Sequence, residues 1–245
     1  MTSPQWFENW FNSPYYHLLY NHRNYNEASL FIKNLCRHLQ LKAHDKVWDL
    51  ACGKGRHSLA LHQMGLDVIG TDLADNSIQE AKEKAEEGLD FFVHDMREPF
   101  REKHFDVVLN LFTSLGYFSN ECDNEKVFKN VDAALKPGGV FVIDFFNSHK
   151  VLSSFRKDYT ETRGDITFQI KKQVQNKRIN KHIEFNCGEK DYYFEEQVSL
   201  LSLEDFEKFA ENTGLKLEKV YGNYLFEAFD PLHSERLIVI FRKGK

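Results

Sequence analysis

The sequence lacks the features that mark several protein classes. Its four cysteines are widely separated and form no CxxC pair, which argues against both a disulfide framework and a zinc site. The longest apolar stretches, such as 140–146, are far shorter than the ~20 residues that a membrane span needs. The amino-terminal stretch has neither a basic n-region nor an apolar h-region, so we expect no secretory signal. These absences predict a soluble, cytoplasmic protein that binds neither a metal nor a membrane.

An excess of positive charge is also missing. The 32 basic and 37 acidic residues give a net charge of −5, which weakens any case for a general nucleic-acid binder. The charged fraction of 28% is close to the ~25% of ordinary soluble proteins, which argues against a disordered chain. Aromatic residues are abundant, with 22 Phe, 10 Tyr and 3 Trp. Each such ring can bury ~150–250 Å², so the chain can build a sizeable core.

The first part of the chain alternates between strand and helix patterns. One amphipathic helix is expected at 27–39, with Leu30, Phe31, Leu35 and Leu39 on its apolar face. The strands expected after it are 47–51, 67–71, 91–93, 105–112 and 140–146, and the helices between them are 58–64, 76–87 and 122–135. Strands separated by helices predict parallel crossovers and an α/β sheet that is covered on both faces.

The pattern then changes to the two-residue period of half-exposed antiparallel strands. These strands are expected at 166–174, 178–185 and 192–201. Helix and strand return afterwards, with a helix at 203–213 between an N-cap at Ser202 and a C′ residue at Gly214, followed by strands at 215–221 and 237–241. We therefore expect a single domain over 1–245. It comprises a helical cap at 1–45, an α/β core at 46–149 and 200–245, and an antiparallel β insertion at 150–199.

A glycine loop follows the first core strand and opens a helix. It reads Asp49-Leu50-Ala51-Cys52-Gly53-Lys54-Gly55-Arg56, and its two glycines would allow a ligand to approach the backbone closely. A dinucleotide fingerprint would carry a third glycine where this chain has Ser58, which argues against a nicotinamide oxidoreductase. By itself such a loop could equally be a tight strand-to-helix turn.

Three further features accompany the loop. Asp72 ends the second strand, where a carboxylate can accept hydrogen bonds from ribose hydroxyls. His94-Asp95-Met96 ends the third strand, and Leu135-Lys136-Pro137-Gly138-Gly139 precedes the fifth. In this order and spacing the features resemble the class I S-adenosylmethionine-dependent methyltransferases. The matching strings are VWDLACGKGRHSLAL, VIGTDLADNSIQEAK, FFVHDMREPF, FDVVLNLFTSLGYF and ALKPGGVFVIDFFN.

The resemblance implies a Rossmann-like sheet of seven strands with the last strand antiparallel, and S-adenosylmethionine as cofactor. It implies that Asp72 holds the ribose, with Leu73 on the adenine and Asp95 and Met96 at the adenine edge. The residues implied near the methionine part are Asp49, Ala51, Gly53 and Gly55, and those near the methyl group are Asn110, Leu111 and Phe112. Tyr20 and Arg23, together with Tyr16, could form a lid over the cofactor, although packing on the core explains the tyrosines equally well.

The segment after the fourth core strand bears on the methyl acceptor. Its Phe-x-Ser-x-Gly-Tyr string, Phe112 to Tyr117, resembles that of small-molecule N-methyltransferases, so we expect a small acceptor with a nucleophilic nitrogen or oxygen and an in-line methyl transfer. An RNA or protein substrate, or a cofactor-binding protein without catalysis, remain the alternatives. Ser114, Tyr117 and His17 are weak candidates for orienting or deprotonating the acceptor, and a surface position is favoured for His17 and His149.

Basic residues are concentrated in the expected insertion, at Lys171, Lys172, Lys177, Arg178 and Lys181. Glu184 and Glu189 interrupt this run. We therefore interpret it as the solvated face of a β hairpin rather than as an RNA-binding surface. The sequence does not predict the oligomeric state.

Overall fold

The computed structural model describes residues 6–20 and 25–245, and within them a seven-stranded sheet forms the centre of the molecule. Its strand order is β10-β11-β5-β4-β1-β2-β3, and β11 runs antiparallel to both of its neighbours. The expected Rossmann-like methyltransferase topology is therefore confirmed. The strands are β1 (Lys46–Leu50), β2 (Asp67–Asp72), β3 (Leu89–Val93), β4 (Phe105–Asn110), β5 (Leu135–Phe146), β10 (Leu215–Tyr221) and β11 (Arg236–Lys243).

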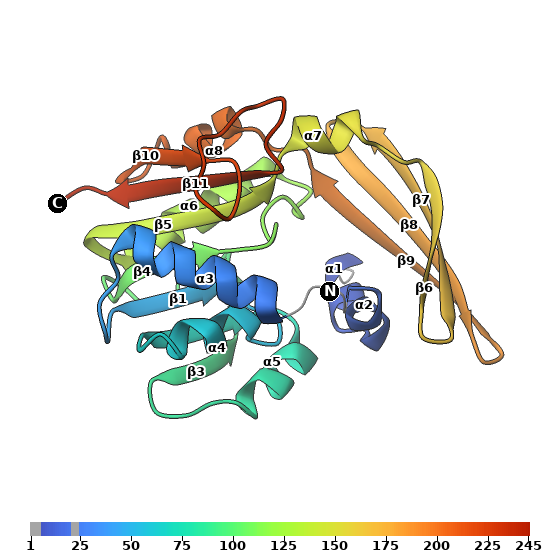
Figure 1. Cartoon of the computed structure of the whole chain (residues 1–245), viewed down its shortest axis with the longest axis horizontal. Helices are drawn as coiled ribbons and strands as arrows, with labels where there is room; N and C mark the ends of the chain where they lie inside the picture. The colour runs from blue at the N-terminus through green and yellow to red at the C-terminus, as the bar shows by residue number, and fades with distance from the viewer. Residues whose placement is uncertain (1–5, 21–24) are drawn as a thin grey trace.

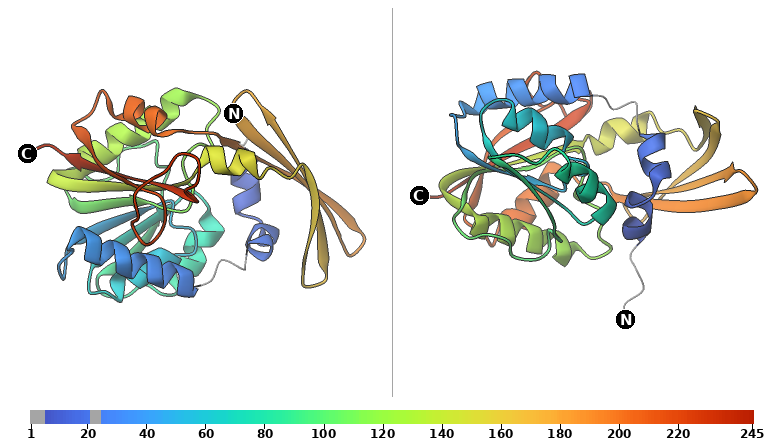
Figure 2. Two further views of the ribbon diagram at one scale, coloured as in Figure 1. Left: turned by 45° about the horizontal axis from the view of Figure 1, so that its top comes forward. Right: turned by 90° about the horizontal axis from the view of Figure 1, so that it is seen from below.

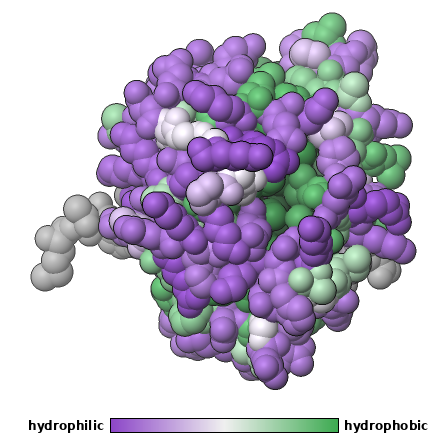
Figure 3. Space-filling view, turned by 90° about the vertical axis from the view of Figure 1, so that its left-hand side faces the viewer, coloured by the Kyte–Doolittle hydropathy of each residue, from purple (hydrophilic) through white to green (hydrophobic). Residues whose placement is uncertain are grey.

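Helices cover both faces of this sheet (Figure 2). One face carries α3 (Tyr25–Leu39), α4 (Arg56–His62) and α5 (Asp75–Lys82), and the other carries α6 (Glu121–Ala134) and α8 (Leu203–Ala210). The central strands β1, β2, β4 and β11 are mostly apolar because both of their faces are buried, whereas the edge strands β3 and β10 are partly exposed. The side on which the parallel strands begin is mostly hydrophilic, and a hollow in it exposes hydrophobic side chains (Figure 3).

A second, four-stranded antiparallel sheet lies beyond the carboxyl ends of the core strands. It consists of β6 (Asp158–Arg163), β7 (Ile166–Gln175), β8 (Arg178–Cys187) and β9 (Lys190–Ser199), in that order, and α7 (Ser148–Ser153) leads into it. The short helices α1 (Trp6–Phe11) and α2 (Pro14–Leu19) lie between the two sheets (Figure 1). Trp10 and Leu19 from these helices are buried against Phe168, Ile183 and Phe185 of the second sheet.

Several local expectations were wrong. Only one helix was expected before β1, yet α1 and α2 precede α3. Six residues are too few to show a helical period. The signal in the sequence was the pair Ser13-Pro14 at the start of α2, where the Ser13 side chain caps the helix by accepting from Tyr15 N. Strand β6 and helix α7 were also missed. Leu30, expected on the apolar face of α3, is 56% exposed. Gly214 is not the C′ residue of α8, because that helix already ends at Ala210.

Candidate functional site

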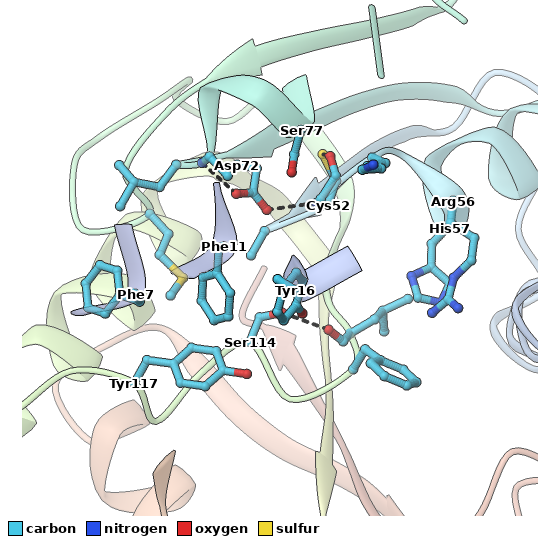
Figure 4. A pocket seen from close by; sticks show the side chains of 18 of the residues that line it. Phe7, Phe11, Tyr16, Cys52, Arg56, His57, Asp72, Ser77, Ser114 and Tyr117 are labelled. Carbon is cyan, nitrogen blue, oxygen red and sulfur yellow. Dashed lines mark hydrogen bonds between the residues drawn. The ribbon is translucent and has the colours of Figure 1, made fainter. Parts of the chain in front are cut away.

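A pocket opens at the carboxyl ends of β1, β2 and β4, beneath α1 and α2 (Figure 4). Its volume is about 410 Å³, within the ~300–1,000 Å³ typical of small-molecule sites. The residues that line it are Phe7, Phe11, Tyr16, His17, Tyr20, Ala51, Cys52, Gly53, Lys54, Arg56, His57, Asp72, Leu73, Ala74, Ser77, His94, Asp95, Met96, Leu111, Phe112, Ser114, Tyr117 and Phe118.

The glycine loop between β1 and α4 forms the floor of this pocket. Ala51, Gly53 and Gly55 all have positive φ angles, of 63°, 55° and 74°, a conformation that glycine adopts without strain. A Cβ atom on Gly55 would lie 2.6 Å from two carbons of the Phe91 ring. The backbone can therefore make this tight turn over Phe91 only with glycine at that position.

Asp72 fixes the loop to the second strand. Its Oδ2 accepts a hydrogen bond from Gly53 N and its Oδ1 accepts one from Ala74 N, both at 2.8 Å. Burial raises the pKa of Asp72, although the backbone N–H groups that it accepts from act in the opposite direction. A carboxylate has about four lone-pair sites, so Asp72 can still accept hydrogen bonds from a ligand in the pocket.

Asp49 lies under the loop rather than on the pocket wall. Its side chain is buried and accepts a hydrogen bond of 2.6 Å from Ser58 Oγ in α4. Burial, and to a lesser extent the nearby Asp72, raises the pKa of Asp49 to about 6. Ser58, the residue that replaces the third glycine of a dinucleotide loop, is therefore the partner of a buried acid.

This geometry gives a pH prediction for Asp49. Its pKa is raised in the folded protein from 3.8 to about 6, so its contribution to stability is present below pH ~4 and is lost as the pH rises through about 6. At pH 7.5 Asp49→Asn should raise the free energy of unfolding by about 1–3 kcal/mol. Urea unfolding at pH 4 and 7.5 measures this. The exposed Asp90 supplies the control Asp90→Asn, and a loss of stability in Asp49→Asn at pH 7.5 would contradict the prediction.

The end of β3 contributes an acid that is already paired. Asp95 lines the pocket, and Arg97 donates to it through Nε and through one terminal nitrogen at 2.6 Å. Burial alone would raise the pKa of Asp95, but the Arg97 guanidinium holds that pKa below its usual value. Asp95 is therefore an anion in a fixed orientation, next to the apolar Met96.

The loop after β4 is held by a cluster that the sequence did not predict. Asp144 on β5 is fully buried and accepts from Phe112 N at 3.0 Å, from Arg236 Nε at 2.7 Å and from the Tyr224 hydroxyl at 3.2 Å. Phe112 and Thr113 both have positive φ angles, of 67° and 63°. The available signal for this cluster was one acid inside the apolar run VFVIDFF, because a buried charge needs partners.

Helices α1 and α2 form the roof of the pocket. In Figure 4, Phe11 and Tyr16 lie between Asp72 on one side and Ser114 and Tyr117 on the other. His17 also lines the pocket, with Nε2 at 3.4 Å from Ser77 Oγ, so the expected surface position was wrong for this histidine. Burial, reinforced by Lys54, lowers the pKa of His17 to about 4, so it is neutral at pH 7. His149, in contrast, is exposed.

Most of the residues expected around the cofactor meet at this pocket, namely Tyr20, Ala51, Gly53, Asp72, Leu73, Asp95, Met96, Leu111 and Phe112, together with the acceptor candidates His17, Ser114 and Tyr117. Asp49, Gly55 and Asn110 do not line it, because each lies in the layer beneath the wall. Arg23 lies outside the described residues. Asn110 is buried and donates through Nδ2 to Leu50 O at 3.1 Å, while its Oδ1 has no partner among the described residues.

Within residues 6–20 and 25–245, none of the helices has the length and hydropathy that crossing a membrane requires. No group of three or more His, Cys, Asp or Glu side chains there is arranged to hold a metal ion.

Comparisons with known proteins agree with this geometry. A family model described as a methyltransferase domain matches residues 47–139. The putative methyltransferase YqeM of Bacillus subtilis is 26% identical over 240 residues, covering 94% of this chain and 95% of that protein. The crystal structure of an S-adenosylmethionine-dependent methyltransferase from Clostridium acetobutylicum has a TM-score of 0.80, with 24% identity over 94% of this chain and 97% of that one. CalS10, an amino pentose methyltransferase from Micromonospora echinaspora, has a TM-score of 0.69, with 18% identity and coverage of 95% and 98%.

The residues of the pocket fit the cofactor of these proteins. S-adenosylmethionine carries a ribose, an ammonium, a sulfonium and an adenine. The pocket offers it the Asp72 carboxylate, the apolar Leu73 and Met96, and a loop without the third glycine of a pyrophosphate site. Because the fold, the family match and the chemistry of this loop all agree, the chain belongs to the class I S-adenosylmethionine-dependent methyltransferases, with S-adenosylmethionine as its cofactor.

Proposed function

We propose that this enzyme methylates a nitrogen or oxygen atom of a small-molecule acceptor. The observation that carries the proposal is the closure of the pocket by α1 and α2, whose Phe7, Phe11 and Tyr16 side chains line it together with Tyr117. A cavity of about 410 Å³ bounded in this way suits a small acceptor beside the cofactor better than a segment of folded protein or structured RNA. We further propose that the enzyme works in the cytoplasm.

Aromatic side chains at the acceptor end favour an amine among the small acceptors. Phe11, Tyr16 and Tyr117 offer π faces and, with Phe7, exclude water. Such faces stabilise the positive charge that develops on a nitrogen as it gains a methyl group. The likeness to CalS10, an amino pentose methyltransferase, supports the same class.

Each wall of the pocket has a role in this proposal. S-adenosylmethionine supplies the methyl group on a sulfonium centre, and the in-line displacement depends mainly on alignment, which can contribute ~7–11 kcal/mol. Asp72 would hold the ribose hydroxyls, Leu73 would pack on the adenine, and Asp95 and Met96 would meet the adenine edge. Ala51 and Gly53, supported from below by Asp49 and Gly55, would hold the methionine part.

The acceptor lies at the other end of the pocket in this proposal. Asn110, Leu111 and Phe112 support the end that faces it, and Tyr20, with Arg23, covers the cofactor. Tyr117 and the neutral His17 are then the side chains able to orient the acceptor. Ser114 is less suited, because its hydroxyl donates to Leu111 O at 3.0 Å within the loop.

The RNA alternative depends on the basic run of the insertion, and the structure weakens it. Lys181 is only 7% exposed and pairs with Glu196, so the expected solvated position was wrong for this lysine. Arg178 donates to carbonyl oxygens of the loop after β4. Two of the five basic residues are therefore turned toward the protein, which leaves a smaller basic surface for a polyanion.

Incubation with methyl-labelled S-adenosylmethionine and fractionated cell extract tests the proposal. We expect label in the fraction of small molecules, with amines as the main products. The Asp72→Ala variant is the control, because a contaminating activity would not respond to that substitution. Label in RNA or in protein, lost in the control, would instead establish the alternative substrates.

A further inference from the structure

Four aromatic side chains form a continuous arc across the roof of the pocket, from Tyr117 at the proposed acceptor end to Tyr20, which is proposed to cover the cofactor. The ring centroids of Tyr117 and Phe11 are 5.2 Å apart, those of Phe11 and Tyr16 are 4.9 Å apart, and those of Tyr16 and Tyr20 are 5.0 Å apart. All four residues line the pocket. The arc crosses three segments of the chain, because α1 and α2 supply its middle and the loop after β4 supplies one end.

Arg178, at the start of β8, holds the Tyr117 end of this arc. Its guanidinium donates to Gly116 O at 3.2 Å and to Phe118 O, the two carbonyls that flank Tyr117. Ser199 N, from the end of β9, donates to the same Gly116 carbonyl at 2.8 Å. A guanidinium has five N–H donors in a rigid planar fork, so one side chain can fix two carbonyls of a loop at once.

A buried charge pair on the same sheet holds the Tyr20 end. Lys181 of β8 lies directly opposite Glu196 of β9, with Nζ and Oε2 3.2 Å apart. Glu196 accepts from the Tyr20 hydroxyl at 2.7 Å and from Trp10 Nε1 at 2.6 Å, and Lys181 donates to the same hydroxyl. Trp10 of α1 and Tyr20, the residue directly after α2, thus share one carboxylate. We refer to α1 and α2 with Tyr20 as the lid.

The hydrogen bonds of these charged residues fix the orientation of the groups they hold, which apolar packing alone does not. The surrounding contacts of Trp10 and Leu19 with Ile183 and Phe185 are hydrophobic, and hydrophobic contacts have little directional preference. A buried ion pair is weak evidence for added stability, since its desolvation cost can match its Coulomb gain. Its hydrogen bonds do, however, fix one orientation of the groups that share it.

We propose that Arg178 and the Lys181–Glu196 pair are positioning residues that hold the two ends of the aromatic arc in register with the cofactor. The antiparallel sheet then acts as the frame of the active-site roof, and β8 carries an anchor for each end. The assignment of the arc to the acceptor rests on the proposed function. The anchoring itself concerns the lid, the loop and the cofactor, so it can be tested without an identified acceptor.

The double variant Lys181→Met, Glu196→Leu tests the lid anchor. Replacing a buried ion pair by apolar residues is often neutral or stabilising, but Trp10 Nε1 and the Tyr20 hydroxyl also lose their acceptor, so the melting temperature of the variant should fall modestly. Its affinity for S-adenosylhomocysteine should fall by about tenfold, the effect of roughly one hydrogen bond to a charged group. Amide hydrogen exchange should become faster in α1 and α2. Lys171→Met, on the exposed side of β7, is the matched control and should change neither quantity.

Arg178→Met tests the loop anchor by the same exchange measurement. Exchange should become faster in residues 113–120 and remain unchanged in α2, whereas the Lys181 and Glu196 substitutions should give the opposite pattern. Arg178→Lys should restore part of the protection, because an ammonium group can still reach one carbonyl.

Two results would overturn the proposal. The first is that the Lys181→Met, Glu196→Leu variant keeps the wild-type affinity for S-adenosylhomocysteine and also keeps the wild-type rate of amide hydrogen exchange in α1 and α2. The second is a uniform rise in exchange across the lid, the loop and the core strands of either variant, which would indicate general stabilisation by these residues rather than local positioning. If the cell-extract assay instead labels RNA or protein, the assignment of the arc to a small acceptor fails while both anchor tests stand.

Discussion

A chain that begins at Tyr25 should lose methyl transfer by on the order of a hundredfold or more, because alignment and the exclusion of water supply much of the catalysis. The deletion removes α1 and α2, and with them the roof formed by Phe7, Phe11, Tyr16, His17 and Tyr20. Turnover of the acceptor found in cell extract, with far-UV circular dichroism as the measure of folding, would test this. A longer deletion that reaches residue 45 is unsuitable, because α3 packs on the core through Phe31, Ile32 and Leu35.

The deletion also uncovers Phe168, Ile170, Ile183 and Phe185 on the second sheet, so aggregation could imitate a catalytic defect. The double variant Phe11→Ala, Tyr16→Ala avoids this. It retains Trp10 and Leu19, which are buried against the second sheet, and removes only the partly buried rings of Phe11 and Tyr16 from that contact. We expect this variant to remain folded and to lose most of its turnover. Full activity in both variants would show that α1 and α2 are not a functional lid.

Asp72→Ala should lower the affinity for S-adenosylmethionine by about ten- to a hundredfold, or roughly 1.5–3 kcal/mol. The substitution removes the carboxylate proposed to accept from the ribose hydroxyls, while water can replace part of that interaction. Asp72→Asn should lose less, because its amide keeps one acceptor oxygen. Titration calorimetry with S-adenosylmethionine and S-adenosylhomocysteine measures both variants. Asp75→Ala, which removes an exposed acid from the first turn of α5, is the matched control.

Asp72→Ala should also lower the free energy of unfolding. The loss should exceed the ~1 kcal/mol that an ordinary N-cap contributes. Asp72 satisfies the backbone N–H groups of Gly53 and Ala74, and leaving buried donors unsatisfied costs about 1–3 kcal/mol. A melting temperature that falls modestly together with a large fall in affinity fits a ribose site organised by Asp72. A fall in melting temperature with unchanged affinity would mean that Asp72 only holds the loop, and that the ribose binds elsewhere.

The sequence by itself determined the core and the floor of the pocket. The strands β1, β2 and β4 are short apolar runs, with the glycine loop directly after β1 and Asp72 at the carboxyl end of β2. Such signals are local: Gly55 is required by a positive φ and by the Phe91 ring beneath it, and Asp72 bonds the amide of a residue only two positions away. Local backbone chemistry can be predicted from spacing because the residues that interact are neighbours in the chain or at one sheet edge.

Only the tertiary structure decided the roof of the site. Lys181 and the exposed Lys171 are both lysines of the expected antiparallel strands, and the sequence does not distinguish them. The strand register places Lys181 opposite Glu196, where its ammonium group donates to the Tyr20 hydroxyl. Arg236 lies 92 residues beyond Asp144 in the chain, yet its partly exposed guanidinium pairs with the buried Asp144 carboxylate, which holds the loop after β4. Such pairings depend on which strands lie side by side and on which face each residue points to. Hydrophobic and electrostatic contacts act through space rather than along the chain. Composition and periodicity therefore cannot predict which residue a given side chain will contact.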